Sequence, residues 1–127
     1  MGYWRFKSYE SDDGNQPWEW LSLQSDDVRH YIWGQLWAIS NIEESPLEES
    51  GDYQGLSQLI IPFDEGTRQV ALIGIWEPES QYFIVFHCTE VDQYSYGLAL
   101  ERALECKRNW EEQLGDIYDL FPDDGIN

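Results

Sequence analysis

Three apolar runs between Leu56 and Glu90 constrain the fold of this chain more than any other feature of its sequence. They read "LSQLIIPF", "TRQVALIGIW" and "QYFIVFHCTE", and only the short segments "DEG" and "EPES" separate them. Each run has the length and the β-branched and aromatic content of a β-strand. Because parallel neighbours need a crossover much longer than these turns, the three runs predict an antiparallel meander.

Side chains of the predicted meander are apolar on both faces of the sheet. Apolar residues occupy both alternating sets in the second and third runs: Val70, Leu72 and Trp76 against Ala71, Ile73 and Ile75, and Phe83 and Val85 against Tyr82, Ile84 and Phe86. A sheet with one solvated face alternates apolar with polar residues instead. We therefore expect either helices of this chain on both faces, or one face covered by a partner or a second copy.

Two further segments have the periodicity of amphipathic helices. In residues 25–41, Ser25 has the position of an N-cap, and Asp26 and Asp27 follow it in the first turn, where acids favour the helix dipole. The apolar stripe of this helix contains Val28, Ile32, Leu36 and Ile39, and two tryptophans widen it, Trp33 and Trp37. Residues 94–121 predict a second, longer helix, with a stripe that contains Ala99, Ala103, Cys106, Trp110, Leu114 and Ile117.

The alternation in residues 3–9 predicts one more strand, which gives the order β-α-β-β-β-α. We expect this strand to pair with the meander, so that about four antiparallel strands form one sheet packed with two helices, an α+β fold. The chain of 127 residues has the length of a single domain, and we assign residues 1–127 to one domain. Within it, we expect an acidic loop at about residues 43–57 and a short acidic tail at about residues 119–127.

Net charge is the most unusual property of the composition. Twenty-five acidic residues face seven basic ones, which gives a formal net charge of -18 and a pI near 4.1. Such a surface attracts basic proteins and repels nucleic acids and anionic membranes, so we expect direct binding to neither of the last two. The longest apolar runs are too short to span a bilayer, and no signal-peptide pattern begins the chain, so the expected location is the cytoplasm.

Residues suited to catalysis or metal binding are few and are not grouped along the chain. There are two histidines, His30 and His87, and two cysteines, Cys88 and Cys106. His87 and Cys88 are neighbours on a predicted strand, so their side chains point to opposite faces and do not form a nucleophile and its base. No metal-ligand spacing or phosphate-binding glycine loop occurs. We therefore expect no enzymatic activity, cofactor or metal, and we expect both cysteines to be buried free thiols.

Acidic residues gather in two stretches that contain no base. No Lys or Arg lies between Arg29 and Arg68, where seven acids occur, and none follows Arg108, where six occur. Duplex DNA also presents closely spaced negative charge, and aromatic residues are common anchors at interfaces. We predict a partner-binding surface in each stretch, with two tryptophans near the first: Glu43, Glu44, Glu48, Glu49 and Asp52 with Trp33 and Trp37, and Asp116, Asp119, Asp123 and Asp124.

These observations favour a non-enzymatic module that binds a basic, nucleic-acid-handling protein by charge complementarity or nucleic-acid mimicry. Its size, acidity and aromatic content are similar in kind to those of small nuclease inhibitors, immunity proteins and phage anti-defence proteins, without a shared motif. An antitoxin-like role belongs to the same class. Two alternatives stay open: a structural or adaptor subunit that dimerises or docks through an apolar sheet face, and a small-ligand binder or enzyme with an aromatic pocket. Acids that serve solubility alone are the simplest interpretation of the same charge.

Overall fold

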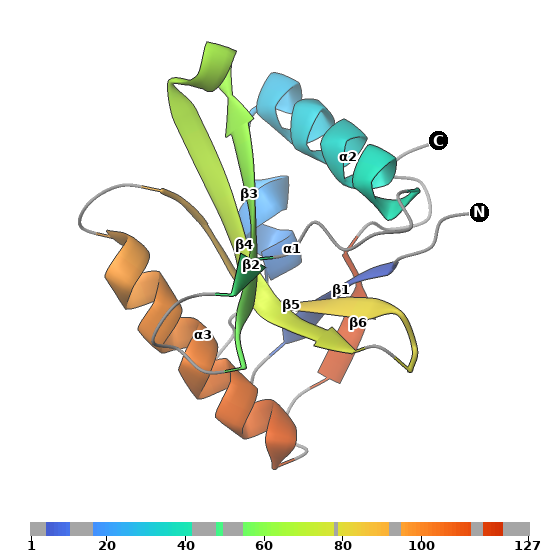
Figure 1. The fold of residues 1–127 in the computed structure, drawn as a ribbon. Coiled ribbons are helices and arrows are strands. Elements are labelled where there is room, and N and C mark those ends of the chain that lie inside the picture. Colours follow the sequence, from blue (N-terminus) through green and yellow to red (C-terminus); the bar gives the residue numbers. More distant parts are fainter. Residues whose placement is uncertain are drawn as a thin grey trace.

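The computed structural model describes residues 5–10, 17–41, 48–49, 55–77, 79–91, 95–112 and 116–120, in which one β-sheet lies between helices (Figure 1). The elements in chain order are β1 (Arg5–Glu10), α1 (Pro17–Ser22), α2 (Asp26–Ser40), β2 (Glu48–Glu49), β3 (Ser57–Phe63), the 3-10 turn η1 (Asp64–Gly66), β4 (Arg68–Glu77), β5 (Tyr82–Glu90), α3 (Ser95–Glu111) and β6 (Asp116–Asp119). Within these residues the six strands have the order β2-β3-β4-β5-β1-β6. The class is α+β, as the sequence predicts.

The predicted meander is confirmed in β3, β4 and β5. β4 pairs antiparallel with both neighbours, and Leu72 lies opposite Leu59 on β3 and Cys88 on β5. The turn Asp64–Gly66 connects β3 and β4 with three consecutive left-handed residues, whose φ angles are 51°, 57° and 88°. Glycine adopts this conformation readily, whereas the two acidic residues before it do so at some cost. The short "DEG" turn therefore holds the hairpin in one register.

The first strand pairs with the meander, but in a different direction from the one expected. β1 runs parallel to β5, with Phe6 opposite Phe83 and Ser8 opposite Val85. The sheet is therefore mixed, and the prediction of a wholly antiparallel sheet is wrong. Between β1 and β5 the chain passes through two helices and the β3–β4 hairpin, a connection long enough for a parallel crossover. The short turns of the meander carry no information about this longer connection.

The second predicted helix is too long. α3 ends at Glu111, and the residues after Gly115 form β6, which pairs antiparallel with β1. Ile117, which we assigned to the helix stripe, is on this strand and is 36% exposed. Local helix preference is weak, and pairing with β1 overrides it. Leu114, also assigned to that stripe, lies outside the described residues.

Two short elements were not expected, and one predicted helix start is confirmed. α1 begins at Pro17, a residue whose fixed φ suits the first helical position. β2 consists of Glu48 and Glu49, inside the segment predicted as an acidic loop. Ser25 is the N-cap of α2, since its side chain accepts a hydrogen bond from the backbone N–H of Val28 at 3.4 Å. The sequence signal for a cap was therefore sufficient to place this helix.

Helices of the chain cover both faces of the sheet, which was the first of the two expected arrangements (Figure 1). One apolar cluster joins α1 and α2 to the sheet, and its members include Leu21, Ile32, Leu36, Phe83 and Val85. The other cluster joins α3 to the opposite face, and its members include Ile73, Ile75, Ile84, Phe86, Ala99, Ala103 and Cys106. Burial of each large apolar side chain contributes about 1.5–3 kcal/mol. The two alternating sets predicted for β4 and β5 are thus both core.

A β-bulge interrupts the pairing of β4 with β5. Ile73 lies opposite His87, whereas the next residue, Gly74, lies opposite Val85, so β5 has one extra residue, Phe86. A Cβ atom at Gly74 would lie 1.8 Å from the carbonyl oxygen of Ile84, so only glycine fits at this position. Because of this extra residue, the side chains of β5 after Phe86 lie on the opposite face of the sheet from the one that strict alternation would give.

Candidate functional site

The predicted acidic surfaces lie at opposite edges of the described sheet. Glu48 and Glu49 form β2 at one edge, and Asp116 and Asp119 begin and end β6 at the other. Five spacings of about 4.8 Å separate the edges, or about 24 Å in all. A further five predicted contacts lie outside the described residues: Glu43, Glu44, Asp52, Asp123 and Asp124. Of the predicted acids, the structure therefore places Glu48 and Glu49 on one edge strand and Asp116 and Asp119 on the other.

At the β6 edge, two carboxylates face each other across the β1–β6 pair. Glu10 is directly opposite Asp116, and Tyr118 is two residues farther along the same face of β6, opposite Ser8. The charges of Asp116 and Glu10 raise the pKa of the Tyr118 phenol, which also hydrogen-bonds Glu10. Like charges directly opposite each other destabilise a strand pair. Glu10, Asp116 and Tyr118 form what we call the β1–β6 acidic site.

Sequence reasoning found only one of the three members of this site. Glu10 and Tyr118 join Asp116 because residues 116–119 are a strand that returns to pair with β1. The four residues "DIYD" contain two β-formers between acids, and Gly115 comes just before them, which is a typical strand boundary. That signal was available, but Ile117 also continued the helical spacing of α3.

The two predicted tryptophans lie on α2, in different environments. Trp37 is 58% exposed, whereas Trp33 is half-buried beside His30, with the two ring centroids 6.2 Å apart. From His30 to Ser40 the sequence of α2 contains no Asp, Glu, Lys or Arg. This part of α2 therefore carries no acidic, lysine or arginine side chains, in contrast to the β1–β6 acidic site.

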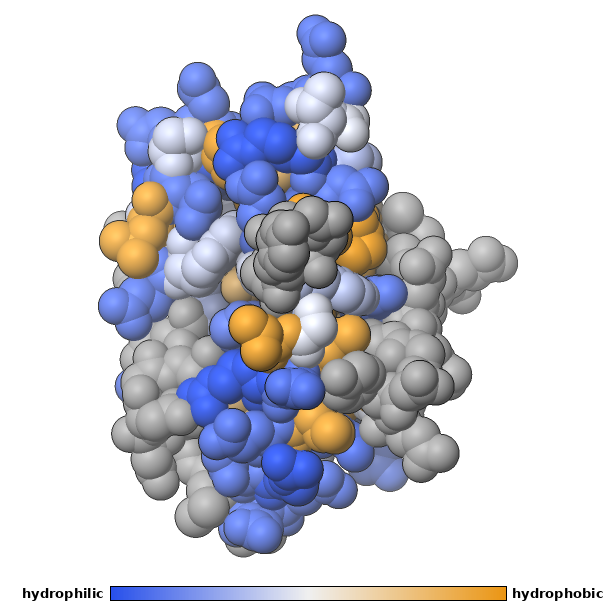
Figure 2. Space-filling model, turned by 90° about the vertical axis from the view of Figure 1, so that its left-hand side faces the viewer, coloured by the Kyte–Doolittle hydropathy of each residue, from blue (hydrophilic) through white to orange (hydrophobic). Residues whose placement is uncertain are grey.

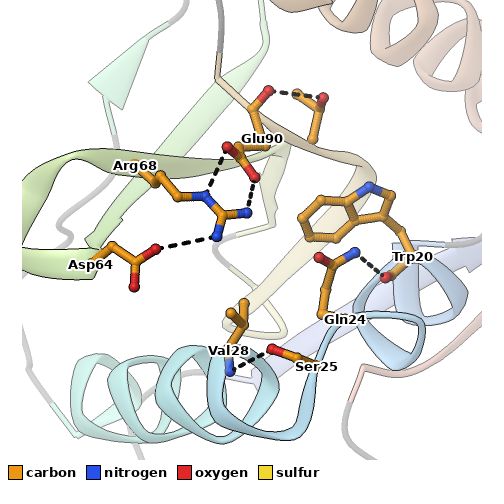
Figure 3. A network of polar contacts seen from close by, with 8 residues as sticks. Trp20, Gln24, Ser25, Val28, Asp64, Arg68 and Glu90 are labelled. Carbon is orange, nitrogen blue, oxygen red and sulfur yellow. Dashed lines mark hydrogen bonds and ion pairs between the residues drawn. The ribbon is translucent and has the colours of Figure 1, made fainter.

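Several basic side chains in the described residues form ion pairs with nearby acids. Figure 3 shows Arg68 between two carboxylates: its Nε donates to Glu90 at 3.0 Å, its Nη2 donates to the second oxygen of Glu90, and its Nη1 donates to Asp64 at 3.2 Å. These acids, Glu90 first, raise the pKa of Arg68. Three further pairs join Arg29 to Asp26, Arg102 to Glu105 and Lys107 to Glu111. Ion pairs this exposed contribute little to stability, but they neutralise bases and leave the acids in excess.

The neighbouring histidine and cysteine of β5 lie on opposite sides of the sheet, as predicted. Cys88 belongs to the cluster under α1 and α2, and burial raises the pKa of its thiol. His87 lies on the other side, near α3, where burial lowers its pKa and the charge of Arg102 lowers it further. A reactive cysteine needs a stabilised thiolate near a base, and this pair provides neither. In the described segments, no three His, Cys, Asp or Glu side chains could hold a metal ion together.

The apolar sheet face required by the adaptor alternative is covered. Ile73 is completely buried and Ile75 is 8% exposed beneath α3. In Figure 2, the described hydrophobic residues on one side of the molecule are scattered among hydrophilic ones. No helix in the described part of the chain is long and apolar enough to cross a membrane.

Comparison of the chain with protein-family models, with curated proteins and with solved structures found no match. The geometry of the β1–β6 acidic site and the charge of the chain are therefore the features that bear on function.

Proposed function

We propose that this chain is a non-enzymatic acidic module that binds and blocks a basic, nucleic-acid-handling protein, in the manner of an inhibitor, immunity protein or antitoxin. One observation carries the proposal: Glu10 lies directly opposite Asp116 at the edge of the sheet. Such a like-charge pair costs about 0.2–1 kcal/mol in the free protein. A cation of a partner placed between the two carboxylates turns that cost into a favourable contact.

Charge supports the proposal at longer range. The formal net charge of -18 gives the whole molecule a strong attraction for a basic surface, which speeds encounter and favours the correct partner. A site built to hold the phosphates of a nucleic acid is such a surface. The cytoplasm, where nucleic-acid-handling proteins are abundant, is the location that we propose.

A capture experiment tests this function. The tagged chain is immobilised, exposed to an extract of the source organism at low salt and washed at rising salt, and the released proteins are identified by mass spectrometry. We expect one basic nucleic-acid-handling protein to bind at low salt and to leave at high salt, because salt screens charge. Retention of no basic protein, or a complex indifferent to salt, would contradict the proposal and leave solubility as the role of the acids.

A further inference from the structure

The backbone of β1 turns its hydrogen-bonding groups alternately toward its two neighbours. The N–H of Arg5 donates to the carbonyl of Gln81, on the β5 side, at 3.0 Å. The carbonyl of Phe6 accepts from the N–H of Leu120, on the β6 side, at 3.0 Å. Because these directions alternate along a strand, the backbone N–H and C=O groups of Ser8 and Glu10 also point toward β6.

The same alternation fixes the outward groups of β6. Ser8 is opposite Tyr118, and Glu10 is opposite Asp116, so Tyr118 and Asp116 turn their N–H and C=O groups toward β1. The backbone groups of Ile117 and Asp119 then point away from the sheet. In the described part of the chain no strand lies beyond β6. The outward N–H and C=O groups of Ile117 and Asp119 are thus the donors and acceptors that an added strand requires.

Charge selects what can add to this edge. A second copy of β6 would bring its own Asp116 and Asp119 to an edge that is already acidic, which is unfavourable. A basic segment would instead be attracted, because the carboxylates of Asp116 and Glu10 lie on one face of the edge. We propose that β6 is a docking edge at which an extended basic segment of the partner adds as an antiparallel strand. This inference rests on the proposed function and specifies the contact at the β1–β6 acidic site.

The geometry also gives the pattern of the docked segment. Residues opposite Asp116 and Tyr118 have their side chains on the face of the two carboxylates, so Lys or Arg fits there. The alternate residues, opposite Ile117 and Asp119, exchange the backbone hydrogen bonds, and one of them lies beside the 36% exposed side chain of Ile117. A basic residue alternating with a β-branched apolar residue is therefore the expected recognition pattern.

Three synthetic peptides test whether a strand forms. The first is acetyl-Lys-Val-Lys-Val-Lys-Val-Lys-amide. The second has a methyl group on the backbone nitrogen of each valine. The third has a methyl group on the backbone nitrogen of each of the three lysines that follow a valine. All three have the same charge, but only the second loses the N–H groups that would face β6. In NMR titrations of the isotope-labelled full chain, we expect the first and third to shift the amide signals of Ile117 and Asp119. The second should bind about tenfold more weakly or worse, because several hydrogen bonds are lost.

Two variants of the chain provide the complementary test. Ile117→Pro removes an outward N–H and leaves the N–H groups that face β1 in place, which is the position where an edge strand tolerates proline. Ile117→Val keeps the N–H and is the matched control. We expect Ile117→Pro to bind the first peptide more weakly than Ile117→Val does, because one donor to the added strand is lost, whereas Ile117→Val should bind it as the unmodified chain does. If Ile117→Pro does not fold, as judged by its NMR spectrum, the peptide comparison on the unmodified chain decides alone.

Two results would overturn the inference. Equal binding of all three peptides to the unmodified chain would mean that charge acts without strand addition, and the proposed function would stand. Absence of any shift at Ile117 and Asp119 would mean that β6 does not accept a strand. Failure of the proposed function itself has a different signature, because the capture experiment then retains no basic protein.

Discussion

The centre of the sheet and its β6 edge are built from opposite kinds of residue. At the centre, β4 pairs on both sides and its residues from Val70 to Ile75 are buried, with helices on both faces. At the edge, Glu10 faces Asp116, and Tyr118 is 54% exposed. The apolar centre therefore holds the fold together against the repulsion of a highly charged surface. The acids at the edge oppose folding slightly, and in our proposal they bind the partner.

A charge placed in the centre should have the largest effect. Ile73 is completely buried between β4 and α3, so Ile73→Asp buries a carboxylate without a partner, which is severely destabilising. We expect circular dichroism and NMR to show an unfolded or aggregated chain. If the variant instead stays folded and only separates an oligomer into monomers, the face is an interface and our assignment of this residue to the core is wrong.

The β-bulge allows a paired test of two glycines. Gly74→Ala places a Cβ 1.8 Å from a backbone oxygen, and we expect a loss of about 3–5 kcal/mol in the free energy of unfolding or failure to fold. Gly34 on α2 has no atom within 4 Å of an added Cβ, so Gly34→Ala should raise stability by about 0.5–1 kcal/mol. Urea denaturation of both variants measures the contrast, and equal effects would refute the close approach at Gly74.

Neutralising one edge carboxylate should have a smaller effect of opposite sign. Glu10→Gln removes the like-charge contact with Asp116, and we expect the free energy of unfolding to rise by about 0.2–1 kcal/mol. The gain should shrink as salt is added, since salt screens exposed charges. Thermal melts at low and high salt measure it, with Glu101→Gln on the exposed side of α3 as the control. A loss of stability would show that the hydrogen bond between Tyr118 and Glu10 outweighs the repulsion of the two carboxylates.

The smallest expected effect is a change in pH dependence. Burial and the charge of Arg102 lower the pKa of His87, so the unfolded chain binds a proton at this histidine more readily than the folded one. Stability should therefore fall as the pH decreases through the ordinary histidine pKa of about 6.5. His87→Gln should flatten this decline in urea titrations between about pH 7.5 and pH 5.5. The same slope in this variant and in the unmodified chain would contradict the assigned environment of His87.

The meander, the alternation of its side chains and the start of α2 were all predictable from the sequence. Each depends on local information: short turns, strand period and the Ser25 cap. The direction of β1 and the identity of β6 depend instead on which distant segments meet. Nothing near Arg5 or Asp116 specifies that Glu10 will lie opposite Asp116, and the i,i+4 spacing of α3 made residues 116–119 resemble more helix. The site was therefore predicted only in part, through its acids, because it forms by tertiary pairing.

The most direct test of the central claim compares two double variants in capture of the basic partner. Glu10→Gln with Asp116→Asn removes both carboxylates of the β1–β6 acidic site, whereas Glu79→Gln with Glu101→Gln changes the net charge equally at exposed positions elsewhere. We expect the first variant to release the partner at much lower salt than the unmodified chain, and the second to differ little from it. Equal behaviour of the two variants would contradict a role for the β1–β6 acidic site in binding, because the edge would then contribute no more than any other pair of acids.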